Sequence, residues 1–305
     1  MSVFKSVEEF VNYANEHDMT LAEVMIEQEM RINEISREDL ENKMFEAYQT
    51  MENGYIKGTT GDGVFSPTGL TGGDAVKMRK YREKGQSLSG DLTLVGVEAA
   101  LATNEVNAAM GVICATPTAG ASGTLPGVIF AMDEQLHLTR EQKLNFLFTA
   151  SLFGMVTANN AFIAGASGGC QAEVGSAAAM SAAAAVAIMG GTPQQSAHAF
   201  AMALGNLLGL VCDPVAGLVE VPCVKRNTVG ATNALICADM ALAGIENIIP
   251  ADEVIDAMYK VGRGLPRELR ETGLGGLAAT PTGNRIKLEL FHVDEDGNKV
   301  KKRKD

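Results

Sequence analysis

Helix-start patterns recur along this chain more clearly than any other local signal. In such a pattern, a hydroxyl side chain and a carboxyl or amide side chain three residues later satisfy free backbone amides of the first turn. Five pairs have this spacing: Ser6 with Glu9, Thr20 with Glu23, Ser36 with Asp39, Thr139 with Gln142, and Thr192 with Gln195. Apolar residues at helical spacing then follow. The sequence therefore predicts an all-α, bundle-like fold with glycine-rich active-site loops.

The interior of this fold must be built mainly from small and aliphatic side chains. Hydrophobic residues make up 46% of the 305 residues, whereas aromatic residues make up 5% and Trp is absent. Small side chains let helices approach one another closely. The most apolar stretches, such as Ala177 to Met189, are rich in Ala and shorter than the roughly 20 residues that span a bilayer. We expect no transmembrane helix.

Most of the chain is expected to form one domain. Residues 1–285 are interpreted as a single all-helical catalytic domain, in which the amphipathic helices of residues 1–54 serve packing or docking. Gly54 is the expected end of the third helix. Residues 55–90 are rich in Gly and polar residues and too long for an ordinary connection. They are therefore expected to be functional or mobile, with helix resuming near Leu94.

The end of the chain has a different pattern. Ile286, Leu288 and Leu290 alternate with polar residues before the turn-like residues 294–298, which allows a short β-hairpin. Residues 286–305 as a whole are interpreted as a charged C-terminal tail.

Net charge and cysteine usage narrow the function classes. The net charge of −12 argues against non-specific binding to nucleic acid or to an anionic membrane. The opening residues lack the basic start and apolar run of a secretory signal, so a cytoplasmic location is expected. Thiols stay reduced there, and the five cysteines are interpreted as core residues or metal ligands instead of disulfides.

Two glycine-rich segments are candidates for ligand binding. In SPTGLTGGDAVK, Ser66–Lys77, three glycines and several hydroxyls precede a predicted helix start, where backbone amides can bind an anion such as a carboxylate. A flexible turn between helices explains this segment equally well. CATPTAGASGTLPG, Cys114–Gly127, indicates backbone that passes close to a ligand, and a break in a core helix would look similar.

Two further segments place cysteines at the ends of predicted elements. They are GGCQAEVGS, residues 168–176, with Cys170, and CDPVAGLVEVPC, residues 212–223, with Cys212 and Cys223. Thiolates in such positions can share a cavity and accept hydrogen bonds from free amides. Their spacing alone favours a metal only weakly, because no CxxC pair is present. Cys114 and Cys237 lie in apolar surroundings and are interpreted as core residues.

These four segments, in this order, resemble the iron-sulfur L-serine dehydratases. GGCQAEVGS and CDPVAGLVEVPC resemble the cluster-binding segments of that family, and TGLTGGDA and TPTAGASGTLPG resemble its substrate-side loops. The resemblance covers residues 50–282, and the separate N-terminal helices resemble the alpha chain of the two-chain bacterial form.

The resemblance implies a 4Fe-4S cluster held by Cys170, Cys212 and Cys223, with one iron left open as a Lewis acid for the serine hydroxyl. Loss of the alpha proton and of hydroxide would then lead to pyruvate and ammonia. The implied substrate-binding residues are Thr68, Gly69, Thr71, Gly72, Gly73, Asp74, Thr116, Thr118, Ala119 and Gly120, with Ser66 and Lys77 as further contributors. Lys225, Arg226 and Asn227 either offset cluster charge, bind substrate or form a surface cap.

No catalytic base lies in the matched segments. All four histidines, His17, His137, His198 and His292, fall outside them. In the family, the candidate base histidines belong to the beta region, so the resemblance implies a separate beta chain that completes the active site of a heteromer. Some single-chain relatives end in a cysteine that can occupy the open iron, whereas no cysteine follows Cys237 here.

Three other functions remain open from the sequence. The same open iron would suit a lyase acting on another β-substituted amino acid such as L-cysteine. Pyridoxal-phosphate chemistry needs a Schiff-base lysine and a phosphate cup, and no motif supplies them. A non-catalytic iron-sulfur sensor would use the cysteines but leaves the two glycine-rich loops unexplained.

Overall fold

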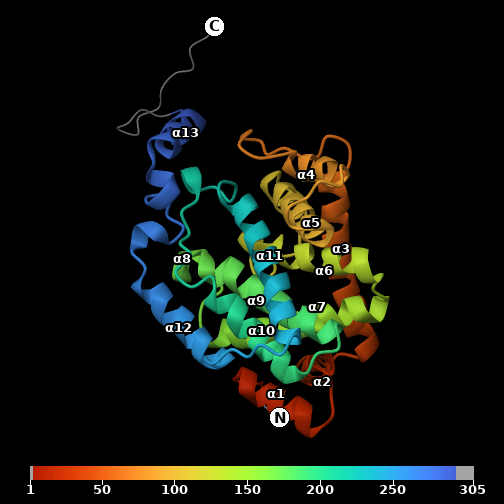
Figure 1. The fold of residues 1–305 in the computed structure, drawn as a ribbon. Coiled ribbons are helices and arrows are strands. Elements are labelled where there is room, and N and C mark those ends of the chain that lie inside the picture. The colour runs from red at the N-terminus through yellow and green to blue at the C-terminus, as the bar shows by residue number, and fades with distance from the viewer. Residues whose placement is uncertain (1–2, 293–305) are drawn as a thin grey trace.

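The computed structural model in Figure 1 describes residues 3–292 and confirms the all-α prediction. Within these residues no β-strand occurs, and two isolated bridges pair Phe65 with Gly72 and Cys212 with Arg270. The described helices are α1 Val7–Glu16, α2 Leu21–Asn33, α3 Arg37–Thr59, α4 Asp74–Arg82, α5 Asp91–Ala108, α6 Thr124–Leu136, α7 Arg140–Asn160, α8 Gly165–Gly168, α9 Ser176–Ile188, α10 Pro193–Gly205, α11 Cys223–Leu242, α12 Ala251–Gly264 and α13 Pro281–Phe291.

Helix α9 forms the centre of the fold. Residues 176–186 are all buried, and α6, α7, α10 and α11 pack around them (Figure 1). Most of these side chains are Ala, which allows the short interaxial distances that such packing requires. The segment Gln171–Ile188 is long and apolar enough to cross a membrane by length and composition, but 89% of it is buried inside the protein. It is therefore a core helix.

All five predicted helix starts are present. The hydroxyls of Ser6, Thr20 and Ser36 accept hydrogen bonds from the backbone amides three residues later. At Thr139 and Thr192 the capping box is complete, because the side chains of Gln142 and Gln195 also reach back to the cap residues.

The predicted end of the third helix at Gly54 is wrong. Helix α3 continues to Thr59, and a further helix, α4, lies inside residues 55–90. A Cβ atom at Gly58 would lie 2.7 Å from the backbone of Ala102, so glycine in this turn allows α3 to pack closely against α5. This contact between distant segments offsets the roughly 1 kcal/mol that glycine costs in a helix.

The predicted C-terminal hairpin is also wrong in its first half. Residues 286, 288 and 290 lie in helix α13. Thr280 caps this helix by accepting a hydrogen bond from the Gly283 amide at 3.1 Å, and Pro281 occupies its first turn. These start signals outweigh a short alternating pattern. The turn-like residues 294–298 lie outside the described residues.

Two helix boundaries position the cysteines. Helix α10 ends at Gly205, which leaves Cys212 in a loop, and α11 begins at Cys223, which places that residue at a helix N-terminus.

Candidate metal centre and substrate loops

Three elements bring Cys170, Cys212 and Cys223 to one region. Cys170 lies between α8 and the π-helical turn Gln171–Gly175, a type of distortion that is frequent at functional sites. Cys212 lies in the loop after α10, where its amide donates to the Leu269 carbonyl at 2.9 Å. Cys223 begins α11.

Glycine is required immediately before Cys170. Gly169 has φ of +79°, and a Cβ atom there would lie 2.6 Å from the Leu265 side chain and 2.9 Å from the Leu210 carbonyl. A bulkier residue would therefore displace the backbone that carries the Cys170 thiol.

The three thiols are buried, and their charges affect one another's pKa values. Cys170 and Cys212 are each 4% exposed, and Cys223 is 8% exposed. Burial raises the pKa of Cys170 and of Cys223 to about 12 in each case. The pKa of Cys212 is raised first by burial and then by the charges of Cys170, Glu173 and Cys223. Cys170 and Cys212 also pack in one buried cluster, and a cation beside the three thiolates would relieve the repulsion between them.

The chemistry of the donor set suits an iron-sulfur cluster. Among residues 3–292, no three His, Cys, Asp or Glu side chains are arranged to hold one metal ion. In an iron-sulfur cluster the thiolates bind different irons, so the sulfur atoms need not converge on one point. The Val174 amide donates a hydrogen bond to the Cys170 thiol. Three buried thiols and an amide donor therefore suit a cluster with three protein ligands.

An ion pair between a half-buried arginine and a buried aspartate lies beside the thiols. Arg226 Nη1 lies 2.7 Å from Asp213 Oδ1 and donates to the Val211 carbonyl at 2.7 Å. The Arg226 guanidinium lowers the pKa of Cys170 and Cys223 and opposes the effect of burial. Arg226 is therefore placed to offset negative charge on the thiolates.

The first glycine-rich loop is attached to the cysteine segment by Glu220. The Thr68 hydroxyl lies 3.0 and 2.9 Å from the two carboxylate oxygens of Glu220, and the Thr71 hydroxyl donates to Oε2 at 2.9 Å. Ser66 Oγ lies 2.9 Å from Thr68 Oγ1. Glu220 is 6% exposed and precedes Cys223 by three residues. The hydroxyls of this loop thus bind a carboxylate within the chain itself.

Glu173 attaches the second glycine-rich loop to the cysteines in a similar way. The Thr118 hydroxyl donates to Glu173 Oε1 at 2.7 Å, and the Cys212 thiol lies 3.9 Å from Glu173 Oε2. The buried carboxyl follows Cys170 by three residues, and burial raises its pKa.

Asn227 fixes the second loop against helix α11. Its Oδ1 accepts from the amides of Gly123 and Thr124 at 3.1 and 3.0 Å. Its Nδ2 donates to the carbonyls of Gly120 and Cys223 at 2.7 and 2.9 Å. Asn227 is fully buried, so it is neither a surface cap nor exposed to solvent.

A third carboxylate, Glu105, occupies the N-terminus of α4. It accepts hydrogen bonds from the amides of Asp74 at 2.6 Å and Ala75 at 3.4 Å. Burial raises the pKa of Glu105 to about 7. The helix N-terminus that was expected to attract a substrate anion therefore binds a protein carboxylate in this structure.

The remaining predicted residues lie around these contacts. The Gly69 amide donates to the Ser66 carbonyl within the first loop, the Gly73 amide donates to the Val64 carbonyl just before it, and Gly72 pairs with Phe65. Asp74 binds Lys77 at 2.7 Å, and the exposed Lys225 lies 3.8 Å from Asp74.

In the second loop, Ala119 O accepts from Asn107 Nδ2 at 3.3 Å. The Thr116 hydroxyl is buried and has no hydrogen-bond partner among the described residues. It is therefore available to a ligand.

Sequence reasoning missed the roles of Glu173 and Glu220. Both are acidic residues within the quoted cysteine segments, which are mostly apolar. An acidic residue that is expected to be buried signals a function, because a buried charge needs a partner. That partner cannot be identified from local sequence, since Thr68 and Thr118 are far away in the chain.

The other two cysteines contact the main hydrophobic core of the protein. Cys237 belongs to that core, Cys114 packs against it, and burial raises the pKa of both thiols. His17, His137 and His292 cap the C-terminal ends of α1, α6 and α13. Among the described hydrogen bonds, no histidine side chain contacts the cysteine segments or the two loops.

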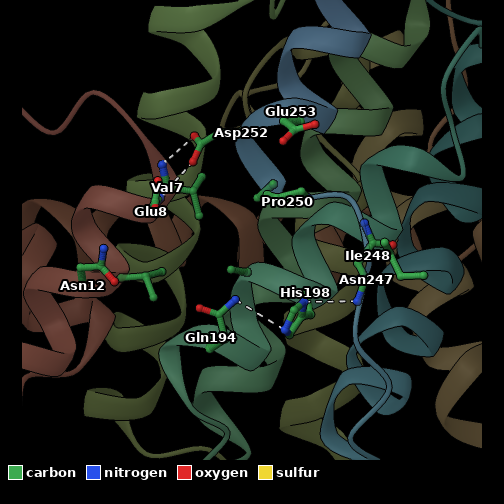
Figure 2. A pocket seen from close by; sticks show the side chains of 13 residues that line it. Val7, Glu8, Asn12, Gln194, His198, Asn247, Ile248, Pro250, Asp252 and Glu253 are labelled. Atoms are coloured by element: carbon green, nitrogen blue, oxygen red, sulfur yellow. Dashed lines mark hydrogen bonds between the residues drawn. The ribbon is translucent and has the colours of Figure 1, made fainter.

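Figure 2 shows a pocket of about 440 Å³ that lies between α1 and the starts of α10 and α12. Asp252 accepts hydrogen bonds from the amides of Val7 and Glu8, and His198 contacts Asn247 and Gln194. None of the cysteines lines this pocket. Because the Asp252 carboxylate binds the N-terminus of α1, this pocket lies at a junction between helices.

A second pocket, of about 410 Å³, adjoins the first glycine-rich loop and is lined partly by Asp74, Lys77 and Lys225.

Comparison with known proteins gives a consistent result. Residues 16–278 match the family described as serine dehydratase alpha chain. The chain is 60% identical over 289 residues to the "Probable L-serine dehydratase, alpha chain" of Bacillus subtilis, covering 95% of this chain and 96% of that protein. It is 40% identical to the "L-serine dehydratase, alpha chain" of Peptoniphilus asaccharolyticus, covering 95% and 99%. It is 35% identical to "L-serine dehydratase 2" of Escherichia coli, covering 90% of this chain but 61% of that protein.

Proposed function

This chain belongs to the serine dehydratase alpha-chain family, and from that premise we propose that it is the cluster-carrying subunit of an L-serine dehydratase that forms pyruvate and ammonia. In this proposal, Cys170, Cys212 and Cys223 hold a 4Fe-4S cluster. When bound, the cluster supplies a Lewis acid for the β-hydroxyl of serine, which makes that group a better leaving group.

The observation that carries this proposal is the connection between the loops and the cysteine segments. Each loop donates hydroxyl hydrogen bonds to a carboxylate three residues from a cysteine: Thr68 and Thr71 to Glu220, and Thr118 to Glu173. The second loop is thus linked through Glu173 to the Cys212 thiol, and the first loop is linked through Glu220 to the segment that leads into Cys223. A purely structural metal site would have no need of such loops.

The first loop is proposed to bind the substrate carboxylate. Its hydroxyls donate hydrogen bonds to the carboxylate of Glu220, and these contacts support the proposal that the loop binds carboxylates. Substrate binding at these hydroxyls then requires exchange with Glu220. The second loop, held by Asn227 and with the unpartnered Thr116 hydroxyl, closes the other side of the site.

A beta chain is proposed to complete the active site and to supply the base that removes the alpha proton. The names of the relatives from B. subtilis and P. asaccharolyticus specify an alpha chain, and the E. coli relative is longer than the matched region. Residues 1–285 are proposed to act as one catalytic unit of such a heteromer. We propose that it works in the cytoplasm, where the thiols remain reduced.

Substitution of single cysteines tests the ligand set. After anaerobic reconstitution, C170S, C212S and C223S should each lose at least one iron per chain and the cluster's visible absorption. The buried Cys237 is the matched control, because C237S should bind iron and sulfide as the wild type does. Full cluster content in all three variants would exclude this ligand set.

A further inference from the structure

The second pocket, of about 410 Å³, lies on the surface between α4, α5 and α11. Its walls are mainly apolar: Met78 and Tyr81 come from α4, and Val97 and Leu101 come from α5. Tyr81 is 41% exposed, so part of its ring faces solvent. A pocket of this kind suits an apolar side chain from a binding partner.

The apolar surface continues from this pocket along α11. Lys225 and Thr228 line the pocket, and Val229 and Ile236 follow Lys225 by four and eleven residues. Residues at these spacings lie on one face of a helix. Val229 is 50% exposed and Ile236 is 57% exposed. A single exposed apolar residue is ordinary, but a patch that adjoins a pocket indicates an interaction surface.

Positive charge surrounds the pocket, although the net charge of the chain is −12. Residues 74–84 contain five basic and two acidic residues. Lys77 and Lys225 line the pocket and are exposed. Lys80 and Lys84 are also exposed, and they belong to none of the ion pairs formed among the described residues. A partner that binds here is therefore expected to present carboxylates around an apolar group.

This surface adjoins the proposed active site. Asp74, a predicted substrate-binding residue, lines the pocket and binds Lys77 at 2.7 Å. Leu101, which also lines the pocket, packs in a small buried cluster with Val224, and Val224 directly follows Cys223. A partner on this surface therefore lies beside the first glycine-rich loop and beside the helix that begins with Cys223.

The pocket in Figure 2 suits such a partner less well. Glu8, Asp252 and Glu253 are among the residues that line it, so it would repel a partner that presents carboxylates. No residue of the two glycine-rich loops lines it.

We propose that the α4–α11 surface, formed by Met78, Tyr81, Val97, Val229 and Ile236 with the lysines around them, is the docking surface for the beta chain. This inference rests on the proposed function, which requires a beta chain, and it assigns the place where that chain binds. The beta chain inserts an apolar side chain into the second pocket and directs carboxylates toward the lysines. Its neighbouring surface then extends over the first glycine-rich loop, where the base is needed.

A second copy of this chain fits the α4–α11 surface less well. In a symmetric dimer the same patch faces itself, so the lysines of the two copies would approach and repel one another. The beta chain is also the partner that must reach the loops, because no histidine side chain contacts them among the described hydrogen bonds.

The test measures the affinity of the full-length chain for its beta chain. Wild type, Y81E and V229E are reconstituted anaerobically, and the Kd for the purified beta chain is measured by biolayer interferometry. I248E is the matched control for V229E, because Ile248 is an exposed β-branched residue that lines the pocket in Figure 2. Turnover of L-serine is recorded while the beta chain is titrated, and iron content and circular dichroism are measured for every protein.

Y81E and V229E should each raise the Kd by at least about tenfold, because docking would bury the new carboxylate among apolar groups and near carboxylates of the partner. I248E should change the Kd by less than about twofold. At saturating beta chain, the kcat of Y81E and of V229E should equal that of the wild type, because neither residue touches substrate.

The lysines are tested by charge reversal. K80E/K84E should lower the association rate constant and weaken its dependence on salt, as expected for charges at the rim of an interface. Lys43 is an exposed lysine of α3, and the control K43E should change neither quantity.

Other results would overturn the proposal in distinguishable ways. Wild-type affinity of Y81E and V229E for the beta chain would exclude the α4–α11 surface, and a kcat that stays low at saturating beta chain would place it in the active site instead. If Y81E does not fold, V229E and its control decide. If sedimentation shows that V229E dissociates a dimer of this chain, the surface binds a second copy. Failure of the wild type to hold iron or to bind the beta chain would instead contradict the proposed function.

Discussion

The Thr68 hydroxyl lies 2.9 Å from a carboxylate oxygen of Glu220, although 152 residues separate them in the sequence. This contact joins the first glycine-rich loop to the segment that leads into Cys223. It makes the loop and the proposed cluster ligand parts of one hydrogen-bonded unit.

Removal of the Glu220 carboxylate should loosen this unit. In E220A the hydroxyls of Thr68 and Thr71 lose their acceptor, and we expect a loss of about 1–3 kcal/mol in the free energy of unfolding. Hydrogen exchange of residues 66–73 should become faster. The exposed Glu246 provides the control E246A, which should change neither quantity. Unchanged exchange in E220A would mean that Glu220 does not order the loop.

Asn227 should support both the second loop and the metal centre. N227A removes five hydrogen-bond contacts: two to Thr124 and one each to Gly120, Gly123 and Cys223. We expect about 1–3 kcal/mol of destabilisation and faster loss of iron to a chelator. Asn233 lies on the same helix and binds Ala203, Asn206 and Cys237 instead of the three proposed ligands, so N233A is the matched control. Equal iron loss in both variants would show a general effect on α11.

Glu105 should make the stability depend on pH near neutrality. Burial raises its pKa from 4.5 to about 7, the charge of Asp74 acts in the same direction, and Lys77 and the two amide hydrogen bonds oppose the shift. Because the pKa of Glu105 is higher in the folded than in the unfolded protein, protonation of Glu105 stabilises the folded state. This contribution to the free energy of unfolding is complete below about pH 4.5 and is lost as the pH rises through about 7.

Denaturant unfolding of wild type and E105Q between about pH 5 and about pH 8 measures this effect. The wild type should lose up to roughly 3 kcal/mol relative to E105Q over that range. Parallel pH profiles of the two proteins would show that Glu105 keeps an ordinary pKa.

Gly165 should not tolerate a side chain. In G165A the new methyl group would lie 2.6 Å from Glu173 Oε2 and 2.8 Å from Cys212 Sγ. Overpacking of this kind costs about 1–3 kcal/mol, and reduced cluster content should accompany it. Gly205, which has nothing within 4 Å of its Cβ position, gives the control G205A. That variant should retain its cluster and gain up to about 1 kcal/mol. Cluster content and thermal unfolding distinguish the two variants.

Local sequence predicted the helices because their start signals are local. Ser6, Thr139 and Thr192 cap helices through residues three positions away. The end of α3 could not be predicted, because the close approach of Gly58 to Ala102 depends on tertiary packing. Alternation over a few residues was misleading at Ile286, where Thr280 and Pro281 start a helix.

The candidate site was predictable in its segments but not in its connections. The glycine-rich loops and the cysteines could be chosen from their composition and from the family resemblance. The carboxylates that join them, Glu173 and Glu220, bind hydroxyls 55 and 152 residues away. Such pairings follow from the fold, which no local pattern encodes.

Mössbauer spectroscopy of the iron-57 cluster, reconstituted anaerobically in this chain together with its beta partner, tests the central claim most directly. Spectra are recorded before and after addition of L-serine. If the chain holds a 4Fe-4S cluster with one open iron, the signal of one iron should shift while the other three remain unchanged. If no cluster assembles, or if all four irons are insensitive to L-serine, the cluster does not activate the substrate and the catalytic proposal is contradicted.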